Sequence, residues 1–348
     1  MPVPLSQIEV IAPNLKRRLS GVTATVARLI PVQARLIGIV TTGPGLPPDL
    51  PHVALWRMGF LPRDRWRVWH ARRNTEMLVG LILRHVLRRK LRLLFTSASQ
   101  RKHTGYTRWL IGQMDAVIAT SARTAGYLER PSRVILHGID TKGFAPVLDR
   151  AALRERLGLP DALLIGCYGR IRAQKGTGDF VEAMIGILPQ RPTAIAFVMG
   201  RATEPHAAYL DGLKTQVAAA GLTDRIRFLP EVTVDRMPDW YRALDIYVAP
   251  QRWEGFGLTP LEAMACAVPV IATRVGAFED LVVPGETGAL VDPGDVPALA
   301  SAMAALIDDP ALRCVQSAAA RARVEQGFRI EDEASALIAV YRQLLETA

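Results

Sequence analysis

At 348 residues the chain is longer than one ordinary domain, and its composition, 49% hydrophobic and 22% charged, excludes a disordered or low-complexity protein. Its net charge of +10 is uneven: residues 1–150 carry 24 Lys and Arg against 8 Asp and Glu, and residues 151–348 carry 19 against 25. We therefore expect two units with different surfaces, the first of which faces an anionic partner.

Membrane-spanning, secreted and metal-binding chains are not indicated. The first residues show no basic stretch followed by an apolar one, so we expect no signal peptide. The longest apolar run, Met77–Leu83, is far shorter than the ~20 residues of a spanning helix. Cys167, Cys266 and Cys314 lie far apart and form no CxxC pair, which predicts a reducing cytosol and no metal or redox role.

Apolar strand-like runs alternate with helical patterns along the first part of the chain. The predicted strands are Ile8–Ile11, Leu36–Val40, Arg92–Thr96, Asp115–Thr120 and Arg133–Leu136. Helices are predicted from Val22 and over Asn74–Lys90. The pattern pauses at Ala145 and Pro146, which predicts a domain boundary there.

A second alternating series begins after a short predicted helix, Ala151–Leu157. Its predicted strands are Leu163–Tyr168, Ala194–Met199, Ile226–Leu229, Ile246–Ala249, Val268–Ala272 and Gly288–Val291. The helices between them are Thr177–Leu188, His206–Ala220, Met237–Ala243 and Pro260–Ala265, and Ala-rich helices follow from Pro297. This alternation predicts an α/β protein with parallel sheets, in which ligands bind at the carboxyl ends of the strands.

The segment from Pro250 to Met264 is the most informative stretch for chemistry. A strand ends at Pro250, a loop with Gly255 and Gly257 follows, and Pro260 suits the first position of a helix. Free backbone amides at such a helix start bind phosphate or sugar oxygens. Glu254 and Glu262 flank the loop. Alternatively, Glu262 serves only a capping box with Thr259, whereas Glu254 has no helix to cap.

A second candidate segment is the turn from Gly169 to Gly176, which follows the first strand of the second series. It carries Arg170 and Lys175. The guanidinium of Arg can bind a phosphate by two parallel hydrogen bonds, and the ammonium of Lys adds a compact positive charge. Together they can neutralise a diphosphate. The alternative is that both are solvated loop cations.

Together these segments resemble the retaining glycosyltransferases of the GT4 family, which have the GT-B fold. Further matching elements are Asp245–Pro250, His137–Asp140, Val268–Thr273 and Gly285–Gly288. The resemblance implies two Rossmann-like domains with parallel sheets facing across a cleft: an acceptor-binding domain at 1–145, a donor-binding domain at 146–330, and a C-terminal helix at 331–348 that can pack back on the first domain. Ala267 departs from the glycine usual in such sequences; if its φ is positive, Ala costs about 1 kcal/mol.

The resemblance also implies roles for the residues of both segments. Arg170 and Lys175 would hold the donor diphosphate and offset the charge of the leaving group. Glu262 would bind the ribose and Glu254 the sugar hydroxyls. The backbone of the loop would meet sugar and phosphate through Gly255, Phe256, Gly257 and Leu258.

In the N-terminal domain the resemblance points to two further residues. Gly21 would belong to a glycine loop that closes on the phosphates, and His103 would touch the sugar, although a surface histidine is the alternative for His103. No Asp-x-Asp motif follows a strand, so we expect no metal, and no cofactor other than the nucleotide-sugar substrate.

The N-terminal domain also carries the positive charge. From Trp56 to Lys102 there are thirteen Lys and Arg, two acidic residues, and the tryptophans Trp56, Trp66 and Trp69. Such a mixture suits an anionic membrane surface or a phosphorylated lipid, and the alternative is a solvated basic face. No nucleic-acid motif accompanies the charge, so we expect no nucleic-acid partner.

Three segments narrow the resemblance to lipopolysaccharide core mannosyltransferases of alphaproteobacteria: Ala12–Thr23, Trp69–Asn74 and Ala249–Gly257. This implies GDP-mannose as donor, the Kdo of an anionic lipid acceptor, and a cytoplasmic protein held peripherally on the inner face of the cell membrane. Two other hypotheses stay open: a GT4 transferase that uses UDP-glucose or another donor on a different acceptor, and a basic binding protein on an inactive scaffold.

Overall fold

The computed structural model describes residues 4–17 and 21–347. The chain divides into two compact units, one formed by residues 1–137 with 330–348 and the other by residues 138–329. Each unit contains one six-stranded sheet in which all paired strands are parallel. The predicted α/β architecture of two parallel sheets is therefore confirmed.

The sheet of the first unit has the order β2-β1-β3-β4-β5-β6. Its strands are β1 (Val10–Pro13), β2 (Ile39–Thr42), β3 (Arg67–Ala71), β4 (Leu91–Ser97), β5 (Ala116–Ala119) and β6 (Arg133–Val134). Its α-helices are α1 (Gly21–Gln33), α2 (Asn74–Leu81), α3 (Gly105–Gly112), α4 (Ala122–Ala125) and α13 (Ile330–Glu346). Two shorter segments matter below, the 3-10 helix η2 (Leu55–Phe60) and the π-helix η3 (Ile82–Val86).

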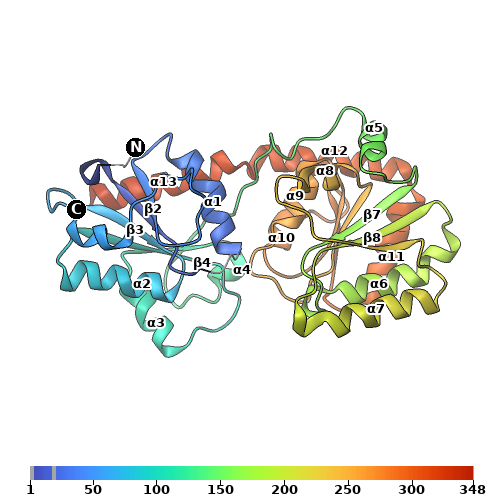
Figure 1. Cartoon of the computed structure of the whole chain (residues 1–348), viewed down its shortest axis with the longest axis horizontal. Coiled ribbons are helices and arrows are strands. Elements are labelled where there is room, and N and C mark those ends of the chain that lie inside the picture. Colours follow the sequence, from blue (N-terminus) through green and yellow to red (C-terminus); the bar gives the residue numbers. More distant parts are fainter. Residues whose placement is uncertain (1–3, 18–20, 348) are drawn as a thin grey trace. The chain divides into compact units, whose positions relative to one another are not determined.

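Helices cover both faces of this sheet because successive strand residues point to opposite faces. Val68 belongs to the core that α1 and α13 cover, whereas its neighbour Trp69 belongs to the core beneath α2 and α3. The last helix thus returns to the first unit, where it lies beside α1 (Figure 1). Both faces are buried, as a doubly wound parallel sheet requires.

Strand β3 was not predicted from the sequence. Its position corrects the expectation that Trp69, and Arg67 among the counted cations, belong to a membrane-facing surface. It lies between β1 and β4, so Trp69 is fully buried and its indole N–H donates to the carbonyl of Glu76 at 2.8 Å. Arg67 is also buried, and it donates to the carbonyls of Ile8 and Pro62 at 3.0 and 2.7 Å. Neither residue is available to a membrane. The polar residues Arg67 and His70 conceal the strand in the sequence, although both are buried.

The sheet of the second unit has the order β12-β11-β10-β7-β8-β9. Its strands are β7 (Leu163–Tyr168), β8 (Ala194–Met199), β9 (Ile226–Leu229), β10 (Ile246–Ala249), β11 (Val270–Thr273) and β12 (Gly288–Val291). The helices are α5 (Arg150–Arg156), α6 (Thr177–Ile187), α7 (Ala207–Ala219), α8 (Met237–Arg242), α9 (Thr259–Ala265), α10 (Phe278–Leu281), α11 (Val296–Asp308) and α12 (Pro310–Gly327). Five of the six strands have the predicted bounds, and only β11, predicted over Val268–Ala272, differs.

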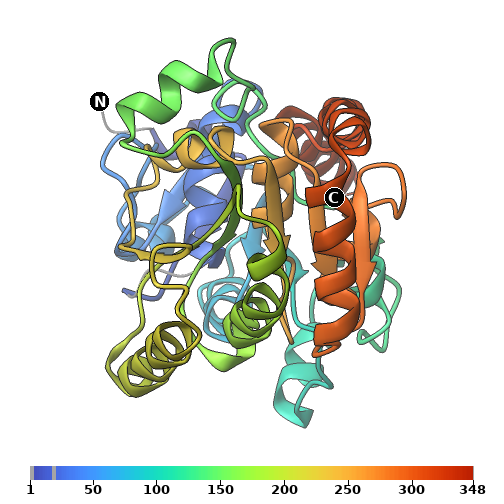
Figure 2. The same ribbon diagram turned by 90° about the vertical axis from the view of Figure 1, so that its right-hand side faces the viewer.

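The core of the second unit fills the space between this sheet and α6, α7 and α11. Figure 2 shows these three helices side by side, with α7 in olive, α6 in green and α11 in orange. On the other side α9 contacts β10, β11 and α12. Because β7 and β10 are neighbours at the centre of the sheet, the turns that follow them come together at its carboxyl edge.

Candidate functional site

A glycine contact joins the two segments that the sequence singled out. Gly176 ends the short 3-10 helix Ala173–Lys175 with φ of +69°, and a Cβ at this position would lie 1.7 Å from the carbonyl oxygen of Pro250. The amide of Arg252 also donates to the carbonyl of Gln174 at 3.1 Å. Only glycine fits this approach, so Gly176 allows the turn after β7 to contact the loop after β10.

This contact brings a cation and a carboxylate of the predicted site together. Lys175 Nζ donates to Glu254 Oε2, while the amide of Gly255 donates to Glu254 Oε1 at 3.0 Å. Both side chains are about one-fifth exposed, so solvent and a ligand can reach them. Lys175 and Glu254 therefore belong to one site, in which each charge is balanced by the other.

Beside this pair lies a small hollow at the carboxyl end of β7. Its lining includes Cys167, Arg170, Lys175, Thr177 and Gln251. Arg170 is exposed and makes no hydrogen bond or ion pair with the described residues. Burial raises the pKa of Cys167 to about 12, so its thiol stays neutral and the charge of the hollow is that of its cations.

Gln251 is a polar residue of this hollow that the sequence analysis missed. Its side chain is buried, and its Oε1 has no hydrogen-bond partner among the described residues. Buried polar atoms are rarely left without a partner, so this oxygen is available to a donor group of a ligand. The signal in the sequence is a polar side chain directly after the buried strand β10 and Pro250.

Arg252, which follows Gln251, has a structural partner instead. Its Nε and Nη2 donate to the two carboxylate oxygens of Asp179 at 2.9 and 2.6 Å. Asp179 is buried in the first turn of α6. Such a bidentate ion pair has a defined geometry, so it fixes the loop after β10 against the start of α6.

Glu262 has a partner outside its own helix. Its Oε2 accepts a hydrogen bond from the hydroxyl of Tyr241 at 2.8 Å. Burial, and secondly the charge of Glu262, raise the pKa of Tyr241, so the phenol remains a donor. Helix α9 begins without a side-chain cap, and Thr259 Oγ1 has no partner among the described residues. Thr259 Oγ1 therefore does not supply its half of the capping box, and Glu262 has a partner, Tyr241, that the capping-box alternative does not require.

Tight packing fixes the loop between the two glutamates. Gly257 has φ of +86°, and a Cβ there would lie 2.3 Å from the Phe278 ring. Phe256 is buried, and its carbonyl accepts from the amide of Ala277 at 3.0 Å. Leu258 is half-buried and stands at the N-cap of α9. The shape of the loop is thus set by its contacts with Ala277 and with Phe278 of α10.

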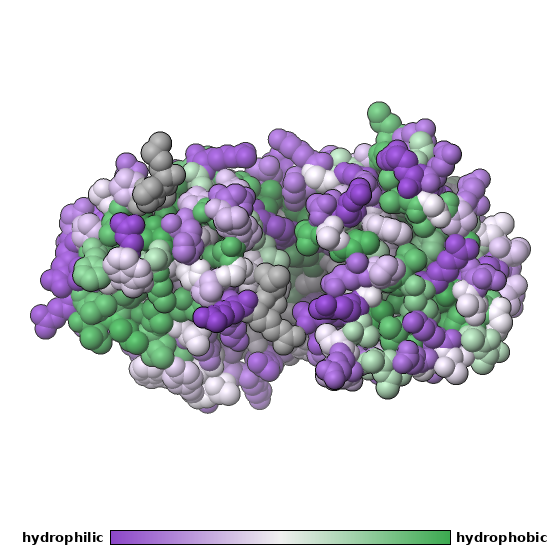
Figure 3. Space-filling view, in the orientation of Figure 1, coloured by the Kyte–Doolittle hydropathy of each residue, from purple (hydrophilic) through white to green (hydrophobic). Residues whose placement is uncertain are grey.

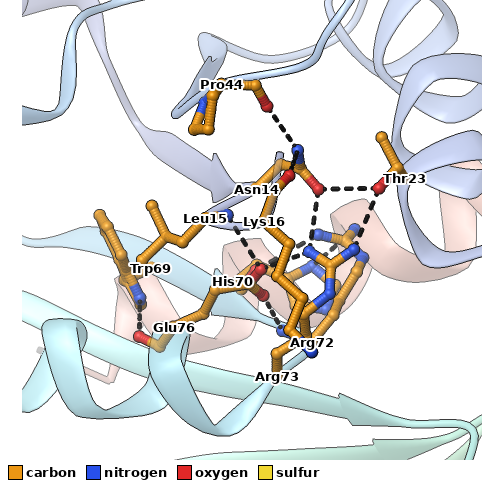
Figure 4. Close-up of polar contacts among 10 residues, drawn as sticks. All are labelled: Asn14, Leu15, Lys16, Thr23, Pro44, Trp69, His70, Arg72, Arg73 and Glu76. Atoms are coloured by element: carbon orange, nitrogen blue, oxygen red, sulfur yellow. Dashed lines mark hydrogen bonds and ion pairs between the residues drawn. The ribbon is translucent and has the colours of Figure 1, made fainter. Parts of the chain in front are cut away.

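In the first unit, a buried network fixes the segment that follows β1 (Figure 4). The carboxylate of Glu76 accepts from the amides of Leu15 and Arg72 at 3.3 and 2.8 Å, and from Arg73 Nη1 at 2.6 Å. Arg73 also donates to Asn14 Oδ1 and Thr23 Oγ1, at 2.8 and 3.0 Å. Two of the segments that narrow the resemblance, residues 12–23 and 69–74, are therefore joined to each other by this network.

The two site residues predicted in the first unit lie on separate elements. Gly21 is the exposed first residue of α1, and residues 18–20 of its loop lie outside the described residues. His103 lies just before α3, where burial and secondly Arg101 lower its pKa, and its Nε2 has no partner among the described residues. The imidazole of His103 is therefore mainly neutral at physiological pH.

Two further classes of site are not found in the part of the chain that the structure describes. No three His, Cys, Asp or Glu side chains among residues 4–17 and 21–347 are grouped so that they could hold a metal ion. Within the same ranges no helix is long and apolar enough to cross a membrane.

Two Rossmann-like units, with cations and two glutamates at the carboxyl edge of the second sheet, define a glycosyltransferase of the GT-B type. Residues 149–323 match the family model described as glycosyl transferases group 1, and the chain belongs to this family. It is 55% identical to the lipopolysaccharide core biosynthesis mannosyltransferase LpsB of Rhizobium meliloti, over 99% of both chains. It is 53% identical to the corresponding mannosyltransferase LpcC of Rhizobium leguminosarum, over 98% of both chains.

The fold comparison agrees with the family. The structure of Anabaena Alr3699/HepE in complex with UDP superposes with a TM-score of 0.84, covering 97% of this chain and 100% of that one. At 20% sequence identity this likeness concerns the fold alone.

Proposed function

We propose that the chain transfers mannose from GDP-mannose, with retention of configuration, to the Kdo of a lipopolysaccharide inner-core lipid acceptor. The observation that carries this proposal is the 55% identity, over 99% of both chains, with a protein named as a lipopolysaccharide core biosynthesis mannosyltransferase. The contact of Lys175 with Glu254 supports it, because the two segments form one site.

In this proposal the second unit binds the donor. Arg170 and Lys175 hold the diphosphate and neutralise the charge that develops on it as the bond to the sugar breaks. Lys175 then shares its charge between the phosphate and Glu254, whose carboxylate accepts hydrogen bonds from the sugar hydroxyls. Glu262, oriented by Tyr241, accepts from the ribose hydroxyls. Gln251 Oε1 takes a further donor group of the ligand.

Leaving-group stabilisation by these cations replaces a metal, and no cofactor takes part. The backbone amides of the loop at 255–258 contact the sugar and the phosphate. The glycine loop that contains Gly21 contacts the phosphates as well. A neutral His103 touches the sugar as a hydrogen-bonding partner. The acceptor hydroxyl attacks from the face that the nucleotide leaves, which gives retention.

The first unit binds the anionic lipid acceptor, and the protein acts in the cytoplasm at the inner face of the cell membrane. With its C-terminal helix this unit carries 23 Lys and Arg against 10 Asp and Glu. A net charge of +13 attracts an acceptor that bears carboxylates and phosphates.

The test is transfer by the purified protein to a Kdo-bearing lipid acceptor, with GDP-mannose and UDP-glucose compared as donors, in EDTA or Mg²⁺. We expect mannose transfer from GDP-mannose, an α-linked product by NMR, and equal initial rates in EDTA and Mg²⁺. Transfer from UDP-glucose instead would favour the rival donor, and a strict metal requirement would refute the proposed neutralisation of the leaving group.

A pair of lysine variants then tests the site itself. Lys175→Ala should lower turnover at least ~100-fold, the usual effect of losing one electrostatic stabiliser. Lys214→Ala, an exposed lysine on α7 of the same unit, is the matched control and should leave turnover unchanged. A folded Lys175→Ala protein with normal turnover would contradict the assignment.

A further inference from the structure

Large apolar side chains are exposed together on one part of the first unit. Three of them are more than two-thirds exposed: Trp56 at 71%, Phe60 at 69% and Val86 at 70%. Figure 3 shows a broad apolar area (green) over the part of the molecule where Figure 1 places α2. We define the apolar surface by six exposed residues: Trp56, Phe60, Ile82, Val86, Leu87 and Trp109.

Contacts within the unit show that these residues are neighbours. Ile82, Val86 and Trp109 line one groove between η3 and α3. The rings of Trp56 and Phe60 meet edge to face with centroids 6.0 Å apart. Leu87 connects the two groups, since its side chain lies beside η2, where a Cβ on Gly59 would be 3.5 Å from it.

Local structure explains why these side chains face solvent. Helix α2 covers the sheet and buries Met77 and Leu81, but from Ile82 the chain continues as the π-helix η3. Only Leu83 of η3 is buried, so Ile82 and Val86 stay outside. An exposed apolar patch of this kind indicates an interaction surface.

Cations surround the apolar surface. Arg63 donates to the carbonyl of Leu87 at 3.3 Å, and Arg88 and Lys90 follow directly along the chain; all three are exposed. From Leu55 to Gln113 the chain has 14 Lys and Arg against only two acids, Asp64 and the buried Glu76. Five of the fourteen pair with carboxylates: Arg67, Arg73, Arg84, Arg92 and Arg108. Arg63, Arg88 and Lys90 make no ion pair with the described residues. Apolar and aromatic side chains can enter the boundary between lipid headgroups and acyl chains, while the surrounding Lys and Arg bind anionic headgroups. This combination favours an anionic lipid surface over a protein partner.

We propose that the apolar surface is the membrane-docking site of this protein. Ile82, Val86 and Trp109 enter the interface below the phosphates of an anionic bilayer, and Arg63, Arg88 and Lys90 bind the phosphates. This inference rests on the proposed function, in that it explains how a chain with a lipid acceptor reaches it. It also assigns membrane contact to Trp109 and not to the buried Trp69.

Flotation with vesicles of phosphatidylcholine, alone or with phosphatidylglycerol, tests the docking. The wild-type protein should float with the anionic vesicles, less with neutral ones, and less at high salt. Ile82→Ser with Val86→Ser should weaken binding about tenfold or more. Val234→Ser with Val315→Ser is the matched control, because both valines are exposed in the second unit. Each of Arg63→Gln and Lys90→Gln should weaken binding about fivefold, whereas Arg156→Gln should not.

Transfer assays separate this inference from the proposed function. The Ile82/Val86 double variant should transfer mannose to a detergent-dispersed acceptor at the wild-type rate and lose transfer on vesicles. If the wild-type protein transfers no mannose but floats as described, the proposed function fails and the docking site stands. If the wild type does not bind anionic vesicles, or the double variant binds as the wild type does, the docking site is refuted and a protein partner is the better reading of the surface.

Discussion

Gly176 is the residue whose replacement tests most directly how the donor site is assembled. In Gly176→Ala the new Cβ would lie 1.7 Å from the Pro250 carbonyl oxygen, against an ordinary C···O contact of about 3.3 Å. The two segments must therefore separate by roughly 1.5 Å, in addition to the ~1–2 kcal/mol of holding Ala at φ of +69°. A misplacement of about 1 Å can lower turnover ~100-fold. We expect at least that loss in transfer from the nucleotide sugar.

The assay compares turnover and free energy of unfolding with those of Gly186→Ala. Gly186 lies in α6 with open space around its Cβ position, so the same substitution should stabilise the protein by roughly 0.5 to 1 kcal/mol and leave turnover unchanged. Circular dichroism establishes that both variants are folded. A folded Gly176→Ala protein with wild-type turnover would refute the idea that this contact positions Lys175 against Glu254.

Three further predictions concern stability and donor binding. Ala267 has φ of +58°, so Ala267→Gly should raise the free energy of unfolding by roughly 0.5 to 1 kcal/mol in urea titrations, whereas Ala305→Gly, on the exposed side of α11, should lower it. Burial lowers the pKa of His70 well below 6.5, so the unfolded chain takes up this proton first. Stability should fall below about pH 6.5 by up to about 1.4 kcal/mol per pH unit, and His70→Gln should reduce that slope; equal slopes would be the contrary result. Tyr241→Phe removes the donor to Glu262 and should weaken nucleotide binding about tenfold by calorimetry, while Tyr127→Phe, at an exposed tyrosine of the first unit, should not.

The expectation about Ala267 shows how far a local rule reaches. The sequence raised a positive φ at Ala267 only as a condition, from a departure from the usual glycine. The structure has this φ, at +58°, where the chain reverses between α9 and β11 within a few residues. The capping box of Thr259 and Glu262 follows an equally local rule, yet the Thr259 hydroxyl makes no cap. The carboxylate of Glu262 accepts a hydrogen bond from the phenol of Tyr241, which lies on another helix.

The first unit shows where pattern reading fails. Residues 67–71 carry Arg and His among apolar residues, and the helical pattern from Asn74 to Lys90 runs past the end of α2 at Leu81. A prediction from the spacing of apolar residues assumes that polar residues are exposed. Here the carbonyls of Ile8 and Pro62 bind Arg67, and Tyr341 and Thr96 bind His70 at 2.7 Å each, so both can be buried.

The sequence by itself determined the alternation of strands and helices, the family, and the two segments of the second unit that carry the chemistry, since these depend on local pattern and motif. Only the tertiary structure decided that Lys175 contacts Glu254, that Trp69 is core, and that exposed apolar side chains gather around η3. Those facts depend on which strands are neighbours and on the approach of Gly176 to Pro250. These contacts join residues up to 81 positions apart, which no local pattern encodes.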